Sequence, residues 1–316
     1  MNNKKVSLLS QRGPDLPNHA HLPNHAQRLL NKHNPVVESS MSSTNTVSAD
    51  VYRDLCELLA ARSGLVLGKH KEYLLATRLT PVLREYGLCS LEDLIKRLDN
   101  STETRLYQRI IDAMTTKETS WFRDEAPFEI LSRHLLPLYA RQGIKQPRIW
   151  SAACATGQEP YSISMAHQEY AFTYPGRLAH VQILASDIAV NALEHAKQGF
   201  YDDLAMHRGL SEQRRRRFFI RQENGWRVIP AVRNAVSFRQ FNLLDSYVLL
   251  GKFDLIFCRN VLIYFAAAVK ADILQRMAAA LKPDGHLFLG SSEALGEAKA
   301  YFETVTTPYG IVYRRL

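Results

Sequence analysis

The sequence predicts an α/β protein: a Rossmann-like, mostly parallel sheet with a small β insertion, preceded by a small all-α domain. Three observations predict this class. Residues 148–163 read as a strand, a tight turn and a helix; short apolar strands and helices then alternate towards residue 316; and leucines recur at helical spacing between residues 48 and 115. The 316 residues, 46% of them apolar, suffice for two domains with buried cores.

The segment from Arg148 to Ile163, RIWSAACATGQEPYSI, is the centre of this prediction. A short apolar run is followed by small residues including Gly157, and Pro160 suits the first turn of a helix because its missing N–H would be unpaired there. In such a unit the ligand binds at the carboxyl end of the strand. A dinucleotide fingerprint needs three glycines, whereas this turn has one. A cofactor with an adenosine moiety and no phosphates fits better, and S-adenosylmethionine is the obvious candidate.

The part before the sheet divides into three. Residues 1–47 are rich in Asn, Pro, Ser and His and are predicted to be a disordered tail, with Met41 as an alternative start. Residues 48–115 predict four helices, which begin near Asp50, Lys69, Ser90 and Thr102; Ser48 and Ser90 are candidate caps, and Gly64 and Gly87 candidate stops. Residues 116–147 predict a linker and a bridging helix.

The domain that contains the sheet is expected over residues 148–316, with a β subdomain at about 200–236. Strands are predicted at Val181–Ser186, 236–240, 253–257 and 286–289, with 310–314 as the final edge strand. A helix from about Ala266 to Leu281 is predicted to end at Lys282–Gly285. The alternation breaks at residues 200–236, where Asn224-Gly225 between apolar runs predicts a hairpin. Four arginines, 214–217, precede it; they could bind phosphate or an acidic protein, but a solvated helix face is the default interpretation.

The net charge of +9 favours an acidic partner without specifying nucleic acid. The helix with Arg78 and Arg84 is as consistent with a docking surface as with a solvated face. Four cysteines lie far apart, so neither a disulfide framework nor a metal site is indicated, and no run approaches the ~18 residues of a membrane span. We therefore expect a soluble, cytoplasmic protein without a metal.

Polar residues follow the predicted strands at the edge where a cofactor would bind. Asp187 is placed to accept from both ribose hydroxyls, although it could instead cap the next helix. Glu159 lies at a helix start, where the dipole favours a carboxylate, and could equally accept from the amino group of a methionine moiety. Asn242-Leu243 could frame the adenine.

Residues 259–264, RNVLIY, occupy the position where methyltransferases of this fold present the acceptor. Asn260 and Tyr264 are four apart without prolines between them, which weakens an assignment to base-amine methylation. A carboxylate acceptor is already a nucleophile at neutral pH and needs orientation and exclusion of water rather than a general base. Arg123 and Tyr264 are the candidates for that role; a domain-bridging salt bridge and core packing are their respective alternatives.

Several motifs together resemble the chemotaxis receptor methyltransferases of the CheR type, over about residues 48–316. They are Met114–Arg123 (MTTKETSWFR), Ala153–Ser162 (ACATGQEPYS), Ala185–Asp187, Phe257–Phe265 (FCRNVLIYF) and Leu281–Gly285 (LKPDG). The resemblance implies S-adenosylmethionine-dependent methyl esterification of glutamate side chains on chemoreceptor cytoplasmic coiled coils.

The resemblance also implies the site residues. The cofactor would contact Lys117, Thr119, Arg123, Glu159, Asp187, Asn242, Leu243, Arg259 and Asn260, with Arg123 and Tyr264 close to the transferred methyl. The helix with Arg78 and Arg84 would face the acidic receptor. The family often has Asn where Lys117 stands, and the hairpin link Gln222–Gly225 is short compared with members that bind a receptor tether. We therefore expect no tether pentapeptide binding, no nucleic acid partner and a monomer.

Two other functions remain open on the sequence: a methyltransferase of RNA or a small molecule, which the basic charge and the arginine run favour, and a cofactor-sensing adaptor without turnover. The receptor, the glutamates, the chemosensory pathway and the role of residues 1–47 are not specified by the sequence.

Overall fold

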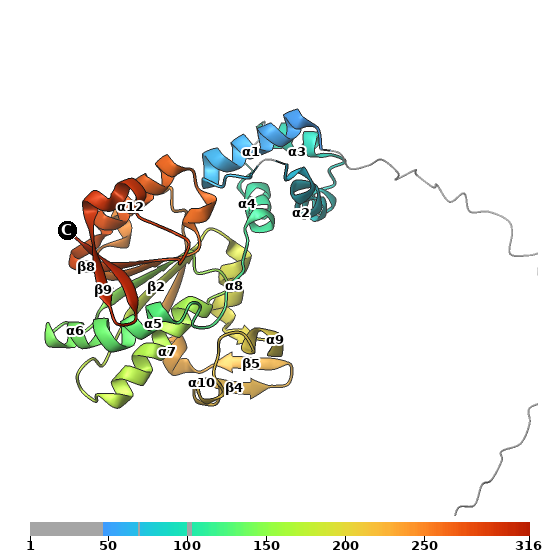
Figure 1. The fold of residues 1–316 in the computed structure, drawn as a ribbon. Helices are drawn as coiled ribbons and strands as arrows, with labels where there is room; N and C mark the ends of the chain where they lie inside the picture. The colour runs from blue at the N-terminus through green and yellow to red at the C-terminus, as the bar shows by residue number, and fades with distance from the viewer. Residues whose placement is uncertain (1–46, 69, 100–102) are drawn as a thin grey trace, which may run out of the picture. The chain divides into compact units, whose positions relative to one another are not determined.

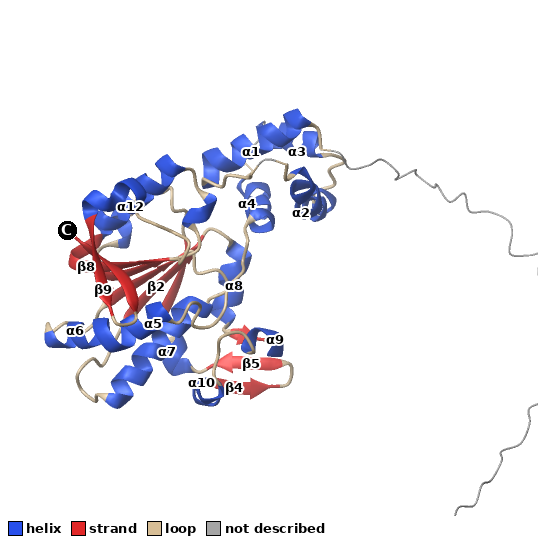
Figure 2. Cartoon of the chain, in the orientation of Figure 1, coloured by secondary structure: helices blue, strands red, loops and turns tan. Residues whose placement is uncertain are grey.

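The computed structural model describes residues 47–68, 70–99 and 103–316, which belong to one unit, Asn45–Leu316. The predicted disordered tail lies outside the described residues except for Val47. Figure 1 shows the order of the elements, and Figure 2 shows the same view coloured by secondary structure.

Four helices precede the sheet: α1 (Ala49–Ser63), α2 (Glu72–Glu85), α3 (Leu91–Asp99) and α4 (Thr104–Met114). The predicted caps are confirmed, because Ser48 Oγ accepts from the N–H of Val51 and Ser90 Oγ from that of Asp93. Gly64 ends α1 in the left-handed region, with φ +74°. The apolar faces form one core, with Leu55, Leu59, Leu75, Leu79 and Leu106 fully buried; each such leucine contributes about 1.5–3 kcal/mol.

A mixed seven-stranded sheet follows, in the order β6-β2-β1-β7-β8-β10-β9. The strands are β1 (Arg148–Ala152), β2 (Gln182–Asp187), β6 (Val236–Gln240), β7 (Phe253–Cys258), β8 (Leu281–Leu289), β9 (Phe302–Thr307) and β10 (Gly310–Arg315). The first five in spatial order are parallel, with Ala152 beside Ser186 on β2 and Cys258 on β7. The chain order reverses direction between β1 and β7, and their carboxyl ends form the switch point where open sheets bind ligands.

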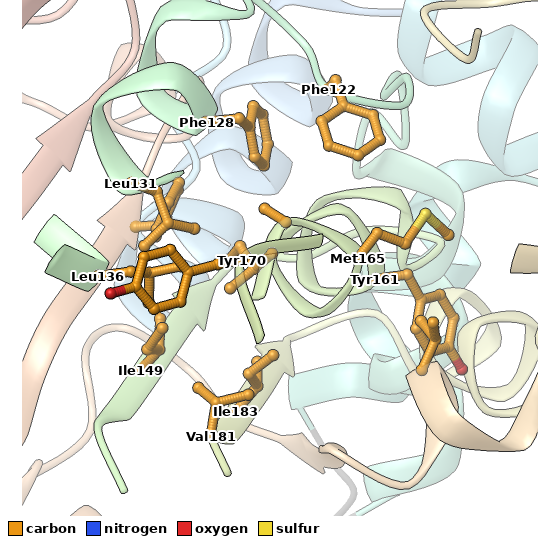
Figure 3. Packing of buried hydrophobic residues seen from close by; sticks show 14 of the residues in the cluster. Phe122, Phe128, Leu131, Leu136, Ile149, Tyr161, Met165, Tyr170, Val181 and Ile183 are labelled. Atoms are coloured by element: carbon orange, nitrogen blue, oxygen red, sulfur yellow. The ribbon is translucent and has the colours of Figure 1, made fainter. Parts of the chain in front are cut away.

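Helices cover both faces of this sheet. On one face pack α5 (Ala126–Ile130), the π-helical stretch η1 (Leu131–Leu135), α6 (Leu136–Arg141) and α7 (Gln158–Thr173), around the core drawn in Figure 3. On the other packs α12 (Ala267–Ala280), around Trp150 and Phe253. The predicted bridging helix is interrupted at η1, just before Pro137, because proline lacks the N–H that an α-helical bond to residue 133 would require.

Two strand predictions are wrong in detail. Residues 310–314 do form a strand, but β10 lies between β8 and β9, so the edge strand is β9, which the sequence analysis missed. The strand predicted at 286–289 begins earlier, at Leu281, and Lys282–Gly285, predicted as the end of the preceding helix, form a bulge inside β8. Leu281 pairs with Phe253 and His286 with Leu255, so four residues oppose Asp254. The buried Asp254 carboxylate holds the bulge by accepting from Lys282 Nζ at 2.7 Å.

The β insertion begins after α8 (Val190–Gln198). It contains the sheet β3-β5-β4, with β3 (Phe200–Tyr201), β4 (Phe219–Gln222) and β5 (Gly225–Val228), the helices α9 (Asp203–Met206) and α10 (Glu212–Phe218), and then α11 (Pro230–Arg233). The hairpin predicted at Asn224-Gly225 is confirmed, with Gln222 opposite Gly225. Among the described residues, no helix combines the length and apolar character needed to cross a bilayer.

Candidate functional site

A pocket of about 990 Å³, part of which is open to solvent, lies at the carboxyl ends of β1 and β7. Its wall includes most of the predicted cofactor and catalytic residues: Thr119, Arg123, Glu159, Asp187, Asn242, Leu243, Arg259, Asn260 and Tyr264. Lys117, Arg78 and Arg84 are not part of this wall. The topology therefore brings together predicted residues that lie up to 145 positions apart in the chain, namely Thr119 and Tyr264.

The backbone at the two strand ends adopts left-handed conformations. Ala153 and Ala155 after β1 have φ +59° and +47°, and Asn260 after β7 has φ +59°. Such values in residues with a Cβ cost of order 1–3 kcal/mol and cluster at binding sites. Gly157, at φ +96°, begins α7 where a Cβ would lie 2.8 Å from that of Ala196. Only glycine allows this close approach between the turn and α8.

Asp187 ends β2 and is half-buried. Oδ2 accepts from the N–H of Ala155 at 2.8 Å and Oδ1 from that of Ala189 at 2.9 Å. The side chain thus connects the turn after β1 to the start of α8. This resembles the helix-capping role that was the alternative to ribose binding. Burial raises the pKa of Asp187, opposed by these N–H donors and by the charge of Lys117. Each oxygen can still accept a further bond, so a ribose remains compatible.

Glu159 and Arg259 form a buried pair within the wall. Arg259 Nη1 lies 3.1 Å from Glu159 Oε2, and Arg259 Nη2 donates to Asp124 Oδ2 at 2.6 Å; only 1% of the Arg259 side chain is exposed. Ser151 Oγ donates to Glu159 Oε1 at 2.8 Å. Burial raises the pKa of Glu159 despite the opposing effect of Arg259. The sequence identified both residues but not their pairing.

Arg123 and Tyr264 border the pocket from different segments. Arg123 is half-buried, and its Nη1 donates to the carbonyl of Glu118 at 3.1 Å, while its own carbonyl accepts from Arg259 Nη2 at 2.8 Å. In the described part of the chain its Nε and Nη2 have no hydrogen-bond partner. The salt bridge considered as its alternative role is therefore not formed. Tyr264 is also half-buried, on the short 3₁₀ helix η3 (Leu262–Tyr264).

The all-α domain contributes a side of the pocket that the sequence analysis missed. Ser63 and Leu65, at the end of α1, line the pocket directly. Asn242 Nδ2 donates to the carbonyl of Arg62 at 2.7 Å, and the N–H of Val66 donates to the carbonyl of Tyr264 at 2.9 Å. No local sequence signal marks these residues, because their role depends on how the two domains pack.

The basic residues of α2 have different surroundings. Arg78 is half-buried and donates to the carbonyl of Met114 at 2.6 Å, so it connects α2 to the end of α4. Arg84 is exposed and has no ion-pair partner among the described residues. Of the two, Arg84 has the guanidinium that is free for an external carboxylate.

The arginine run on α10 is not simply solvated, which corrects the default interpretation. Arg214 binds Glu169 through two bonds of 2.9 Å and lies 3.7 Å over the Phe122 ring. Arg215 pairs with Glu212 and contacts Trp226, and Arg217 contacts Phe172. The Arg214 contacts hold the insertion against the segment before α5, whereas Arg216 and Arg217 are exposed.

The pocket suits S-adenosylmethionine chemically. Arg259 Nε is buried without a partner and so can take a carboxylate. Glu159 and Asp187, two half-buried carboxylates whose pKa is raised by desolvation, suit a ligand that brings a cation and hydroxyl donors. Groups of three or more His, Cys, Asp or Glu side chains that could hold a metal ion do not occur among the described residues.

Comparisons with known proteins show the family of the chain. Residues 50–115 match the family model "CheR methyltransferase, all-alpha domain", and residues 117–311 match "CheR methyltransferase, SAM binding domain". The chain is 51% identical to Chemotaxis protein methyltransferase 1 of Pseudomonas aeruginosa over 254 residues, 79% of this chain and 92% of that protein. It is 46% identical to Chemotaxis protein methyltransferase 1 of Vibrio cholerae over 271 residues, 85% and 98% of the two chains. The Chemotaxis protein methyltransferase of Escherichia coli is 37% identical over 256 residues, 79% and 86%.

Proposed function

Because the chain belongs to the CheR methyltransferase family and uses S-adenosylmethionine, we propose that it esterifies glutamate side chains on the cytoplasmic coiled coils of chemoreceptors, as part of chemotactic adaptation. One observation carries the choice of a carboxylate acceptor. Arg123 borders the cofactor pocket with Nε and Nη2 free of partners in the described chain, so it can bind a carboxylate there.

The residues that would hold the cofactor are the ones that already line the pocket. Glu159 would take its ammonium group, Arg259 Nε its carboxylate and Asp187 its ribose hydroxyls. Asn242 and Leu243 would border the adenine with their backbone, since the Asn242 amide is bonded to Arg62. Thr119 would complete the wall, and Lys117 would act through its charge near Asp187.

When bound, the cofactor supplies an electrophilic methyl group on a sulfonium. The acceptor carboxylate is ionised at neutral pH, so no side chain needs to remove a proton. Arg123 orients it by donating to an oxygen that does not react, and the Tyr264 hydroxyl provides a second donor at the pocket wall. Ser63 and Leu65 help to exclude water, which would compete for donors.

The acceptor would reach the site along α2, where Arg84 is available for acidic side chains of a receptor helix. We propose further that the enzyme works as a monomer in the cytoplasm and that it does not bind a tether pentapeptide, given the two-residue turn at Glu223-Asn224. The domain limits at residues 48, 116 and 148 stay predictions.

Methylation with labelled S-adenosylmethionine tests this function. Purified protein is incubated with a chemoreceptor cytoplasmic fragment, the same fragment with its methylation-site glutamates replaced by alanine, and total RNA. We expect label on the first fragment alone, released as methanol by mild alkali as an ester requires. Alkali-stable label on RNA, or cofactor binding without transfer to either acceptor, would instead support the nucleic-acid enzyme or the adaptor.

A further inference from the structure

Glu293 lies in the turn after β8, and its carboxylate accepts from four backbone N–H groups. Oε2 accepts from Gly290 at 2.7 Å and from Asn260 at 2.8 Å; Oε1 accepts from Leu262 at 2.7 Å and from Ile263 at 3.3 Å. Three of these donors belong to the loop after β7 and one to the turn that holds Glu293 itself. A carboxylate with several N–H donors is bound as an anion in a nest of amides.

The loop held by Glu293 is the one that borders the pocket at the end of β7. Asn260, Val261 and Tyr264 line the pocket, and Asn260 is in the left-handed region at φ +59°. Leu262 and Ile263 begin η3, whose first N–H groups have no partner within the short helix. Without Glu293, the N–H groups of Asn260, Leu262 and Ile263 would lose their acceptor. The hydrogen bond that holds Asn260 in its left-handed conformation would also be lost.

Position 290 is shaped for the same contact. A Cβ on Gly290 would lie 2.6 Å from Glu293 Oε2 and 2.8 Å from both the backbone N and the Nδ2 of Asn260. The glycine is buried, and its φ is not in the left-handed region, so close approach rather than backbone conformation requires it. Gly290 therefore leaves the space through which Glu293 reaches Asn260.

We infer that Glu293 is a positioning residue for methyl transfer: its carboxylate fixes Asn260 against the cofactor and Tyr264 against the acceptor. This inference has two halves. The acceptor half, the placement of Tyr264, rests on the proposed function, whereas the cofactor half, the placement of Asn260, does not. Neither Glu293 nor Gly290 is part of the pocket wall, so the action is through the loop. Because Asn260 shares one carboxylate oxygen with Gly290, a change at either position displaces it.

Calorimetric titration with S-adenosylhomocysteine tests the cofactor half. The variants are Glu293→Ala, Glu293→Gln and Gly290→Ala, and Glu297→Gln is the control, since Glu297 is an exposed carboxylate on η4 (Gly296–Tyr301) of the following segment. We expect Glu293→Ala to raise the Kd about tenfold or more. Glu293→Gln should be intermediate, because its amide offers one acceptor oxygen and turns a donor towards the other N–H groups. Gly290→Ala should resemble Glu293→Ala, and Glu297→Gln the parent protein.

Turnover on a receptor fragment tests the acceptor half. In Glu293→Ala, kcat at saturating cofactor should fall about tenfold or more, with the Glu293→Gln value again between. A purely structural role would lower Tm and the folded fraction but leave Kd and kcat per folded molecule unchanged, which would overturn the inference. If the parent protein methylated no receptor, the proposed function would fail while the titration still decided the role of Glu293 toward the cofactor.

Discussion

Arg259 Nη1 and Glu159 Oε2 lie 3.1 Å apart, and they connect the loop after β7 to the first turn of α7. Asp124 accepts from the same guanidinium at 2.6 Å, so one buried cation joins three segments around the pocket. In the proposed function, the pair would offer opposite charges to the two ends of the cofactor's amino acid moiety.

Replacing Arg259 should therefore be costly for the fold. Arg259→Ala would leave the Glu159 carboxylate buried beside Ser151 without its cation, and breaking a buried pair costs about 3–5 kcal/mol. Urea unfolding measures this free energy. Arg53→Ala is the control, because Arg53 pairs with the exposed Asp50 on α1 and surface pairs contribute about 0–1 kcal/mol. Equal losses in the two variants would contradict the account.

Arg123 should matter to turnover rather than to stability. Arg123→Ala removes a half-buried side chain with one bond to the Glu118 carbonyl, so the free energy of unfolding should change by about 1 kcal/mol or less. The kcat on a receptor fragment should fall about a hundredfold, the effect of removing one oriented donor from a reacting centre. Near-normal kcat in the folded variant would remove Arg123 from the mechanism.

Cofactor affinity should depend on pH through Asp187 and Glu159. Burial raises the pKa of both above the ordinary values of 3.8 and 4.5, and the ionised forms accept from the ligand. The affinity for S-adenosylhomocysteine should therefore fall as the pH is lowered through these raised pKa values. The fall should begin at a higher pH than ordinary carboxylates would give. The free energy of unfolding of the ligand-free protein should depend on pH in the opposite direction. Because the raised pKa values make the folded state bind more protons than the unfolded state, these two groups lower the free energy of unfolding as pH rises from 3.8 through their folded pKa values.

Variants of the two carboxylates separate their parts. Asp187→Ala should weaken binding of S-adenosylhomocysteine by about 1.5–3 kcal/mol, the contribution of hydrogen bonds to a charged group. Glu159→Gln keeps an acceptor for Arg259 and removes one titrating group, so its affinity should vary less with pH. Calorimetry at several pH values measures both effects, and a pH profile of Glu159→Gln that overlaid the parent's would exclude Glu159 as a titrating group.

Arg84 should contribute to receptor recognition. It is exposed and unpaired in the described chain, so Arg84→Glu should raise the KM for a receptor fragment several-fold at low salt and leave kcat unchanged, with the difference shrinking as salt is added. Arg239→Glu, an exposed arginine on β6, makes the same charge change outside α2 and serves as control. A common increase in KM would indicate a net-charge effect and contradict a docking role.

Gly209 should be required for the contact between the insertion and the segment before α5. Its φ is +82°, and a Cβ would lie 2.0 Å from the carbonyl oxygen of Trp121. An alanine in the left-handed conformation costs about 1–2 kcal/mol by itself, and Gly209→Ala should lower the free energy of unfolding by more than this because of the added clash. Gly143→Ala is the matched control, with φ +73° and open space around the Cβ. If thermal unfolding gave the two variants the same Tm, the backbone at Trp121 would have moved to accommodate the new Cβ, which would contradict the prediction.

Local patterns in the sequence predicted much of the fold. Leu55, Leu59 and Leu75 lie on helix faces that any packing partner would bury, and Ser48 caps α1 through a bond three residues away. Asp187, Asn242 and Asn260 could be placed in a site because parallel strands end at one edge of a sheet. Each of these inferences needs only short-range chemistry or the general topology of parallel sheets.

The parts that were missed depend on long-range pairing. That β10 lies inside the sheet follows from its bonds to β8 and β9, which no property of residues 310–314 reveals. Arg214 appeared as one charge of a run, yet its partner Glu169 lies 45 residues earlier. Glu293 looks like an ordinary loop residue until Asn260, 33 positions away, is placed beside it.

The insertion leaves and rejoins the main fold at one point, where the N–H of Val228 donates to the carbonyl of Gly199 at 2.9 Å. The far end of the hairpin, at Glu223-Asn224, can therefore gain or lose residues without moving this junction or the pocket beyond it. A chain built in this way can evolve new docking preferences at its tip while the chemistry at the sheet stays as it is.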